Sequence, residues 1–133
     1  MASELRVDTL KDSSGNNSVG MAYVAGGSAK AWVNFNGTGT IATRDSVNIS
    51  SLDDDGTGLF GTNFTSSFSN VNYAQAAIHG NEVSSSVTSM QVRGYAQTTT
   101  TSASAINTFY STSSTTANTD QTHNAVLYHG DLA

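Results

Sequence analysis

Alternation of apolar and polar side chains with a period of two residues limits most strongly how this chain can fold. It is clearest over residues 30–36, where Ala31, Val33 and Phe35 fall on one face and Trp32 falls on the other. This period is that of a half-buried β-strand, whose successive side chains point to opposite sides. The sequence therefore predicts a strand here, with the face of Val33 turned toward a core.

Short runs of the same kind recur along the chain, separated by Gly, Asn and Asp in the absence of any proline. Strands at a spacing of about 8–12 residues are typical of sandwiches and barrels. Because Ser, Thr, Asn and Gly are abundant and disfavour helix interiors, we expect no helix. The runs expected to form strands are residues 4–10, 30–36, 41–43, 47–51, 58–64, 73–79, 89–97, 105–110 and 124–129.

The remaining segments read as connections. Residues 12–17 and 53–56 combine Asp, Asn and Gly, which are favoured in tight turns, and Asn36-Gly37 has the same character. Residues 26–28 read as a flexible link, and the Ser/Thr-rich stretches 98–102 and 111–119 as exposed loops. We therefore expect an all-β chain: an antiparallel, jelly-roll-like β-sandwich over residues 29–133. Residues 1–28 form a strand and linker that pair with a neighbouring subunit or an anchor.

Charge and composition exclude several functions. The 133 residues carry a net charge of −5, and the five Lys and Arg residues are scattered rather than clustered. Nucleic-acid binding needs clustered cations, so we expect no nucleic-acid partner. With no cysteine, a disulfide framework and a Cys-based zinc site are impossible. No run approaches the roughly 18 apolar residues of a membrane span, and the N-terminus lacks the apolar core of a secretory signal.

One stretch resembles a known class of proteins. Residues 29–39, AKAWVNFNGTG, are similar to a motif common in tail-fibre-like proteins of marine tailed phages, including cyanophages. The likeness continues through RDSVNISS at 44–51, DDDGTG at 53–58, NF at 63–64 and NVNY at 70–73. It is fainter in LRVDTL at 5–10 and AVLYHGDL at 125–132, and residues 80–122 match no pattern of this class.

The resemblance implies a structural virion protein, located in the virion, that assembles as a homotrimer. Its partners would be copies of itself, other tail or capsid proteins, and host cell-surface polysaccharide. Long fibres often carry such a module at the end of a stalk, whereas here the module begins almost at once. We expect a tail-fibre or appendage module that contributes to host attachment. The alternative is a capsid decoration or head-fibre protein without receptor binding.

The acidic triplet Asp53, Asp54 and Asp55 is the best candidate for a cation site. Calcium needs several oxygen ligands around it, and the spacing of an EF-hand loop is missing. A solvated turn is the favoured interpretation, and a weak Ca²⁺ site is the alternative.

Enzymatic activity is not expected, and neither is a cofactor. Glycoside hydrolysis usually needs two positioned carboxylates, and no acidic pair stands in a recognisable motif. The chain has no Gly-x-Ser-x-Gly elbow and no P-loop. His79, His123 and His129 lack the His-x-His spacing of metal sites on trimer axes, so we interpret them as surface or hydrogen-bonded histidines.

Carbohydrate binding is the functional idea that the residues leave open. Trp32, the single Trp, either stacks on a sugar or packs against another subunit or sheet, and packing is favoured because aromatic residues dominate buried contacts. Tyr95, Phe109 and Tyr110 flank the Ser/Thr-rich stretches. Binding sites tend to lie on loops of a rigid scaffold, so we expect a receptor site, if present, in that region.

Overall fold

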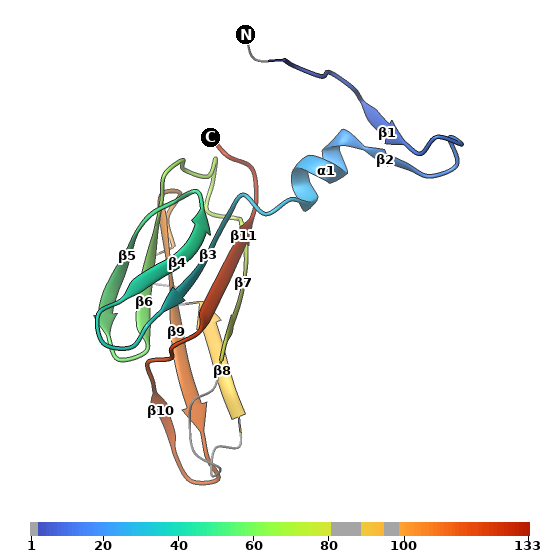
Figure 1. The fold of residues 1–133 in the computed structure, drawn as a ribbon. Coiled ribbons are helices and arrows are strands. Elements are labelled where there is room, and N and C mark those ends of the chain that lie inside the picture. Colours follow the sequence, from blue (N-terminus) through green and yellow to red (C-terminus); the bar gives the residue numbers. More distant parts are fainter. Residues whose placement is uncertain (1–2, 81–88, 95–98) are drawn as a thin grey trace.

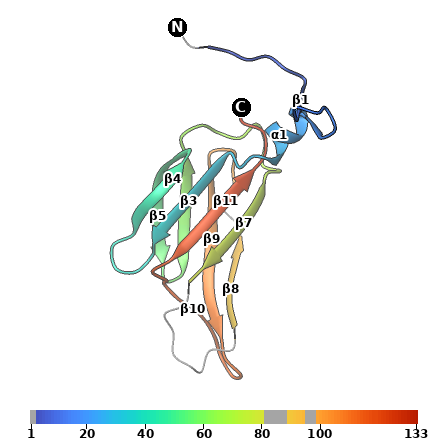
Figure 2. The same cartoon turned by 45° about the vertical axis from the view of Figure 1, so that its right-hand side comes forward.

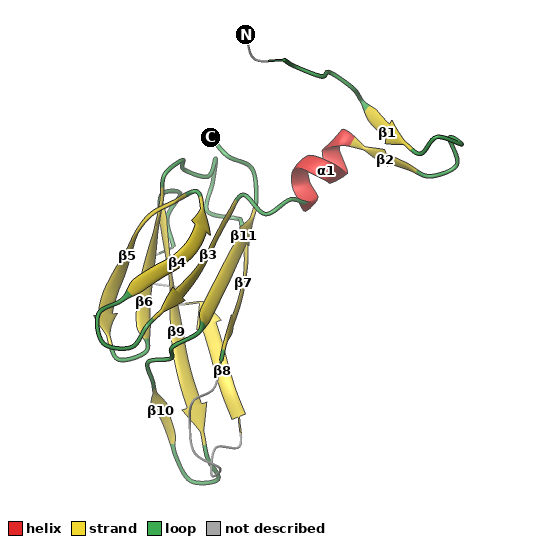
Figure 3. Cartoon of the chain, in the orientation of Figure 1, coloured by secondary structure: helices red, strands yellow, loops and turns green. Residues whose placement is uncertain are grey.

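The fold was analysed in a computed structural model that describes residues 3–80 and 99–133, together with the backbone of residues 89–94. The described chain is mostly β-strand, paired antiparallel throughout, with one short helix (Figures 1 and 3). This confirms the all-β class that the alternation predicts. Two larger sheets form the body of the molecule, and a small hairpin with the helix precedes them.

The first sheet has four strands in the order β4-β3-β11-β7. These are β3 (Ala31–Asn36), β4 (Ala42–Val47), β7 (Ala74–His79) and β11 (Asn124–His129). The predicted alternation in β3 is confirmed, since Ala31, Val33 and Phe35 are buried and the residues between them are half-buried. The first and last strands of the body, β3 and β11, are neighbours at the centre of this sheet (Figure 2).

The second sheet has five strands: β5 (Ile49–Gly56), β6 (Leu59–Phe64), β8 (Ser89–Gly94), β9 (Ala103–Ser111) and β10 (Thr116–Asn118). Strands β6 and β8 both pair with Ile106 and Asn107 of β9, so they lie on opposite sides of it. Strand β10 pairs with residues 109–111, which β8 also pairs. It therefore lies beyond the end of β6, on the same side of β9.

Side chains from both sheets meet in one hydrophobic cluster. Val33 and Phe35 of β3 and Tyr128 of β11 pack with Phe60 of β6 and Ile106 of β9. The rings of Phe35 and Phe60 meet edge to face with centroids 5.2 Å apart, a favourable arrangement for aromatic pairs. The chain alternates between the sheets, with β3–β4 in the first, β5–β6 in the second, β7 in the first, β8–β10 in the second and β11 in the first.

The turn between β5 and β6 differs from its predicted place. Asp53, Asp54, Asp55 and Gly56 were expected to form the connection, but they lie in β5, and Thr57-Gly58 form the turn. Gly58 adopts φ +66°, a conformation that glycine takes without strain. Its backbone N–H donates to Asp120 Oδ1 at 2.6 Å, and its carbonyl accepts from Thr108 N at 2.7 Å. These bonds hold the turn at residues 57–58, directly after the Asp-rich segment 53–56 where it was predicted.

Residues 3–28, here called the arm, lie outside both sheets (Figure 1). They contain β1 (Thr9–Lys11) and β2 (Ser18–Gly20), paired with each other, and then α1 (Met21–Gly27). The predicted turn at 12–17 is confirmed, because Asp12 accepts bonds from Ser14 N, Asn16 N and Asn17 Nδ2. These bonds to Asn17 and the backbone lower the pKa of the Asp12 carboxyl.

Three further expectations need correction. The helix α1 ends in Gly26-Gly27, which were expected to belong to a flexible link, and the backbone N–H of Ser28 closes its last turn by donating to the carbonyl of Val24. The first predicted strand, residues 4–10, forms only at its end, as β1. The loop predicted over 111–119 contains β10, which pairs with β9.

The two ends of the body differ in what they carry. The C-terminus and the arm lie at one end of the molecule, and the turn between β9 and β10 lies at the other (Figures 1 and 2).

Of the residues described, no helix is long and apolar enough to cross a membrane.

Candidate functional site

The outward face of the four-stranded sheet carries a row of apolar side chains. Trp32 of β3 pairs with Val47 of β4 on one side and with Leu127 of β11 on the other, and Leu127 pairs with Ala76 of β7. Directly paired residues share a face of the sheet. Because Val33 and Val126 point to the core, their neighbours Trp32 and Leu127 point away from it.

A second row lies beside the first, formed by Asp45, Asn34, Ala125 and Ile78 in the same strand order. The two rows leave large apolar side chains uncovered: Ile78 is 72% exposed, Val47 47% and Leu127 39%. Single exposed apolar residues are common on monomers, but a contiguous apolar patch marks an interaction site.

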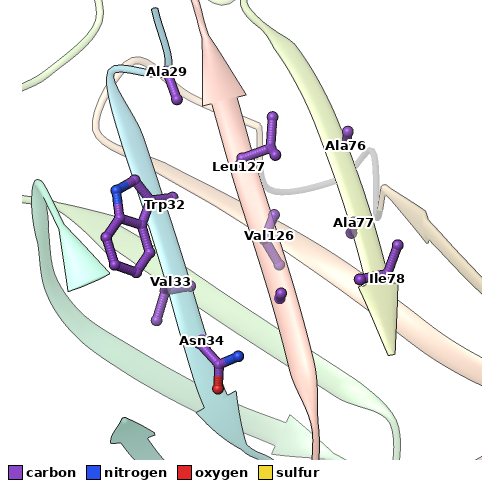
Figure 4. A pocket seen from close by; sticks show the side chains of 10 residues that line it. Ala29, Trp32, Val33, Asn34, Ala76, Ala77, Ile78, Val126 and Leu127 are labelled. Atoms are coloured by element: carbon purple, nitrogen blue, oxygen red, sulfur yellow. The ribbon is translucent and has the colours of Figure 1, made fainter. Parts of the chain in front are cut away.

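Between these rows the face is hollowed into an apolar groove of about 410 Å³ (Figure 4). Trp32 stands on one side of it, Ile78 and Ala76 on the other, and Leu127 between them (Figure 4). Small residues on β7 and β11 create this hollow, since Ala76 and Ala125 leave room that larger side chains would fill. The groove is lined by Ala29, Trp32, Val33, Asn34, Ala76, Ala77, Ile78, Ala125, Val126 and Leu127.

The groove continues into a more polar hollow at the far ends of β7 and β3. Asn34, Ile78 and Ala125 line both, and the second also has His79 and His123 in its lining. The backbone N–H of Gly80 donates to the carbonyl of His123 at 2.7 Å, which fixes the distance between the two chain segments. His123 is exposed, and its Nδ1 lies 3.0 Å from Thr122 Oγ1.

The chemistry of the groove favours an apolar partner over a sugar. Sugar recognition combines an aromatic surface with several converging polar side chains that bond the hydroxyls. Among the described lining residues, Asn34 and the indole N–H of Trp32 supply the polar side-chain groups, and the other lining side chains are alkyl. Whether Trp32 packs against another subunit or stacks on a ligand stays a prediction, with packing the favoured interpretation.

Phe109 and Tyr110 lie elsewhere, near the end of β9. There β9 and β10 form a hairpin, closed by a turn at residues 112–115 in which Thr112 N donates to Thr115 O at 2.7 Å. We call residues 109–118 the tip. Ser113, Ser114 and Thr115 are exposed, while Phe109 and Tyr110 are half-buried. Tyr95, the third predicted receptor residue of this region, lies outside the described residues.

Of the predicted receptor residues that the structure describes, Trp32 therefore lies in a different site from Phe109 and Tyr110. Trp32 belongs to the groove on the four-stranded sheet, and Phe109 and Tyr110 belong to the tip on the five-stranded sheet. Sequence reasoning missed Ile78 and Leu127, which make the groove with Trp32. Their alternation was visible, but which faces meet depends on the pairing of β3, β11 and β7, which a single sequence does not reveal.

The Asp triplet does not form a cation cage. The three carboxylates follow one another along β5 and alternate between its two sides. Asp53 accepts a bond from Asn63 Nδ2 at 2.7 Å, and Asp54 one from Gly56 N at 3.2 Å. Among the residues described, no three His, Cys, Asp or Glu side chains gather as metal ligands.

Comparisons with models of known protein families, with curated proteins and with solved structures find no match to this chain.

Proposed function

We propose that this chain is a structural virion protein of a tailed phage, a subunit of a homotrimeric tail-fibre or appendage module that contributes to host attachment. The virion assignment rests on the resemblance of residues 29–39 and the segments after them to tail-fibre-like proteins. The structural observation that carries the assembly is the apolar groove on the outward sheet face. A subunit that exposes 72% of Ile78 beside Leu127 and Trp32 gains stability when another subunit covers them.

We interpret the two sheets as a sandwich of jelly-roll type. The order β3-β11-β7 in one sheet and β6-β9-β8 in the other interleaves early and late strands, as two Greek keys do. The shared core of Phe35, Phe60 and Tyr128 supports this interpretation. In this scheme β4 and β5 extend the two sheets at one side.

The arrangement of the ends supports a direction for the appendage. The arm and the C-terminus lie at the end that would join the assembly to the virion, and the tip would face the host (Figure 2). Exposed hydroxyls of Ser113, Ser114 and Thr115, on the same hairpin as Phe109 and Tyr110, suit a polysaccharide ligand. We therefore place receptor contact, within this proposal, at the tip and not in the groove.

Two measurements on the virion test this function. Immunogold labelling should place the protein at the tail, whereas label across the head would instead support a capsid decoration or head fibre. Antibody Fab fragments raised against the chain should block adsorption of the phage to its host. Normal adsorption with the protein saturated by Fab would contradict a role in attachment.

A further inference from the structure

We propose that the arm of one subunit packs into the apolar groove of a second copy, so that each subunit of the assembly both gives an arm and receives one. The inference deepens the proposed function and rests on its assembly from several copies. It names the surfaces that meet, which the proposed trimer alone leaves open.

The body leaves the large apolar side chains of the described arm exposed. No residue of α1 is buried, and Tyr23 on it is 80% exposed. Before the helix, Leu5 is 80% exposed, Leu10 42% and Val19 39%. An isolated two-stranded hairpin and a helix of seven residues are each marginal in water without tertiary contacts. The arm therefore needs an apolar partner surface, and its exposed residues form one side of such a contact.

The described part of the body offers a surface of matching chemistry, the groove. The groove is apolar, its floor is formed by alanines, and its lining carries no ionisable side chain. Small residues also recur in α1, with Ala22, Ala25 and Gly26 among its seven positions. A helix with small residues can approach the alanine-lined floor of the groove closely. Tyr23 is then available to fill the space beside Trp32.

The connection between arm and body points the arm away from its own groove. Residues 28–30 alone join α1 to β3, and Ser28 has the extended values φ −83° and ψ 135°, so the chain does not reverse there. Lys30 is fixed on both sides: its backbone N–H donates to Tyr128 O at 2.8 Å, and its Nζ bonds the carbonyl of Ala25. In Figure 1 the arm accordingly projects beyond the body.

The root of the arm nevertheless lies at the groove, because Ala29 is part of the lining. An arm that leaves one groove and enters the next makes a head-to-tail contact between different surfaces. Such contacts close into a ring when the rotation between copies permits, and three copies form the smallest ring above a dimer. A second copy thus supplies both the occupant of the groove and the closure of the proposed trimer.

Photo-crosslinking tests the contact in the full-length protein. Tyr23 is replaced by p-benzoylphenylalanine, an aromatic residue that captures nearby C–H bonds, in ¹⁴N protein mixed with ¹⁵N-labelled wild type. After irradiation, mass spectrometry should find Tyr23→p-benzoylphenylalanine joined to ¹⁵N peptides from β3, β7 or β11. The same replacement at Val71, which is 51% exposed in a loop, is the control and should give no such product.

The outcomes separate the arm contact from the proposed trimer. Crosslinks from position 23 to the ¹⁴N chain's own groove, or to any other surface of the ¹⁵N chain, overturn arm exchange even where light scattering finds a trimer. Absence of crosslinks in a trimeric protein overturns it as well. A monomeric wild type overturns both the arm contact and the proposed assembly.

Two surface variants give an independent readout. Ile78→Glu places a charge at the groove, and Tyr23→Asp places one on the arm, while both positions are too exposed to support the fold of a lone subunit. Each should weaken association roughly tenfold or more, as loss of a central interface residue does. Val71→Glu should leave association unchanged. Undiminished association of both groove and arm variants contradicts the proposal.

Discussion

The hydroxyl of Tyr128 on β11 lies 2.6 Å from Oγ1 of Thr62 on β6, a hydrogen bond that joins the two sheets inside the core. Thr62 Oγ1 also donates to the carbonyl of Ser104 at 3.1 Å, so its single hydrogen is used and Tyr128 is the donor. Both side chains are fully buried. The bond therefore gives a polar partner to a phenol whose ring packs against the aromatic rings of Phe64 and Tyr73.

Loss of this bond should cost a measurable part of the stability. Tyr128→Phe keeps the ring but removes the donor, so we expect a loss of about 1 kcal/mol in the free energy of unfolding. Thr62→Val should cost more, because it leaves the buried phenol and Ser104 O without their partner. Urea unfolding of both variants and the double variant gives the coupling energy. Strictly additive losses would show that the two hydroxyls do not interact.

The same tyrosine should make the protein sensitive to alkali. Burial raises the pKa of Tyr128 to about 12 from its usual value near 10, and its hydrogen bond to Thr62 offsets only part of this. A raised pKa means that the unfolded chain loses this proton first. Below pH 10 the phenol is protonated in both states and the stability that it contributes is complete. As the pH rises toward 12, the free energy of unfolding should fall by about 2 to 3 kcal/mol.

Unfolding free energies across this pH range, compared between wild type and Tyr128→Phe, isolate the effect, because the variant keeps every other titrating group. Because the wild type starts about 1 kcal/mol more stable and loses more than that, the order of the two proteins should reverse between pH 10 and 12. Tyrosinate absorbance of the variant should lack one late-titrating phenol that the wild type shows. Equal pH dependence in both proteins would mean that Tyr128 is not protected by burial.

Gly58 lies in the turn between β5 and β6, and Gly39, between β3 and β4, serves as its control. Both have positive φ, +66° and +65°, but a Cβ at Gly58 would clash with Thr108 O and approach Thr119 N to 2.8 Å, while Gly39 has open space. Gly39→Ala should cost about 1 kcal/mol for its backbone conformation alone. Gly58→Ala should cost at least twice that, measured by thermal or urea unfolding. Similar losses in the two variants would show that Gly58 is not closely packed.

Removal of residues 1–10 should impair incorporation into the virion more than folding. These residues lie outside the shared core of the two sheets, so the body keeps its hydrophobic contacts without them. We expect the circular dichroism spectrum to lose no more than the small contribution of the β1–β2 pair, and the unfolding transition in dilute solution to stay cooperative, with less protein on purified particles. A much lower unfolding temperature in dilute solution would contradict this separation of roles.

Receptor contact at the tip predicts a phenotype that spares the fold. Ser113→Glu together with Ser114→Glu alters exposed positions of the turn, so stability should change by no more than about 0.5 kcal/mol. Adsorption of phage carrying the double variant should fall, because the added charges and lost hydroxyls oppose a polysaccharide ligand. Val71→Glu, at an exposed loop position away from the tip, is the control. Normal adsorption of the double variant would place receptor contact elsewhere.

The sequence predicted best those strands in which one face is buried and the other is not. Strand β11 begins and ends as expected, and β3 differs by one residue, because a core on one side forces strict alternation. It failed for α1, whose seven residues show no clear helical period. It also failed for the end of β5, where the Asp-rich composition resembles a turn but bonds across the sheet to Asn63.

The groove was harder to predict than the fold. The sequence singles out Trp32, for which packing is the favoured interpretation, but its neighbours Leu127 and Ile78 come from strands 95 and 46 positions further along the chain. Their side chains meet because β11 lies between β3 and β7, a neighbour relation set by the whole topology. Local patterns assign faces to strands, whereas the partners of each face depend on long-range pairing.

The molar mass of the full-length protein in solution tests the central claim most directly. Light scattering behind a sizing column should give three times 13.8 kDa for wild type, since grooves and arms would then cover one another. Dilution should shift the mass toward one copy. A mass of 13.8 kDa at every concentration measured would contradict the account, because the groove and the arm would both remain exposed in the free protein.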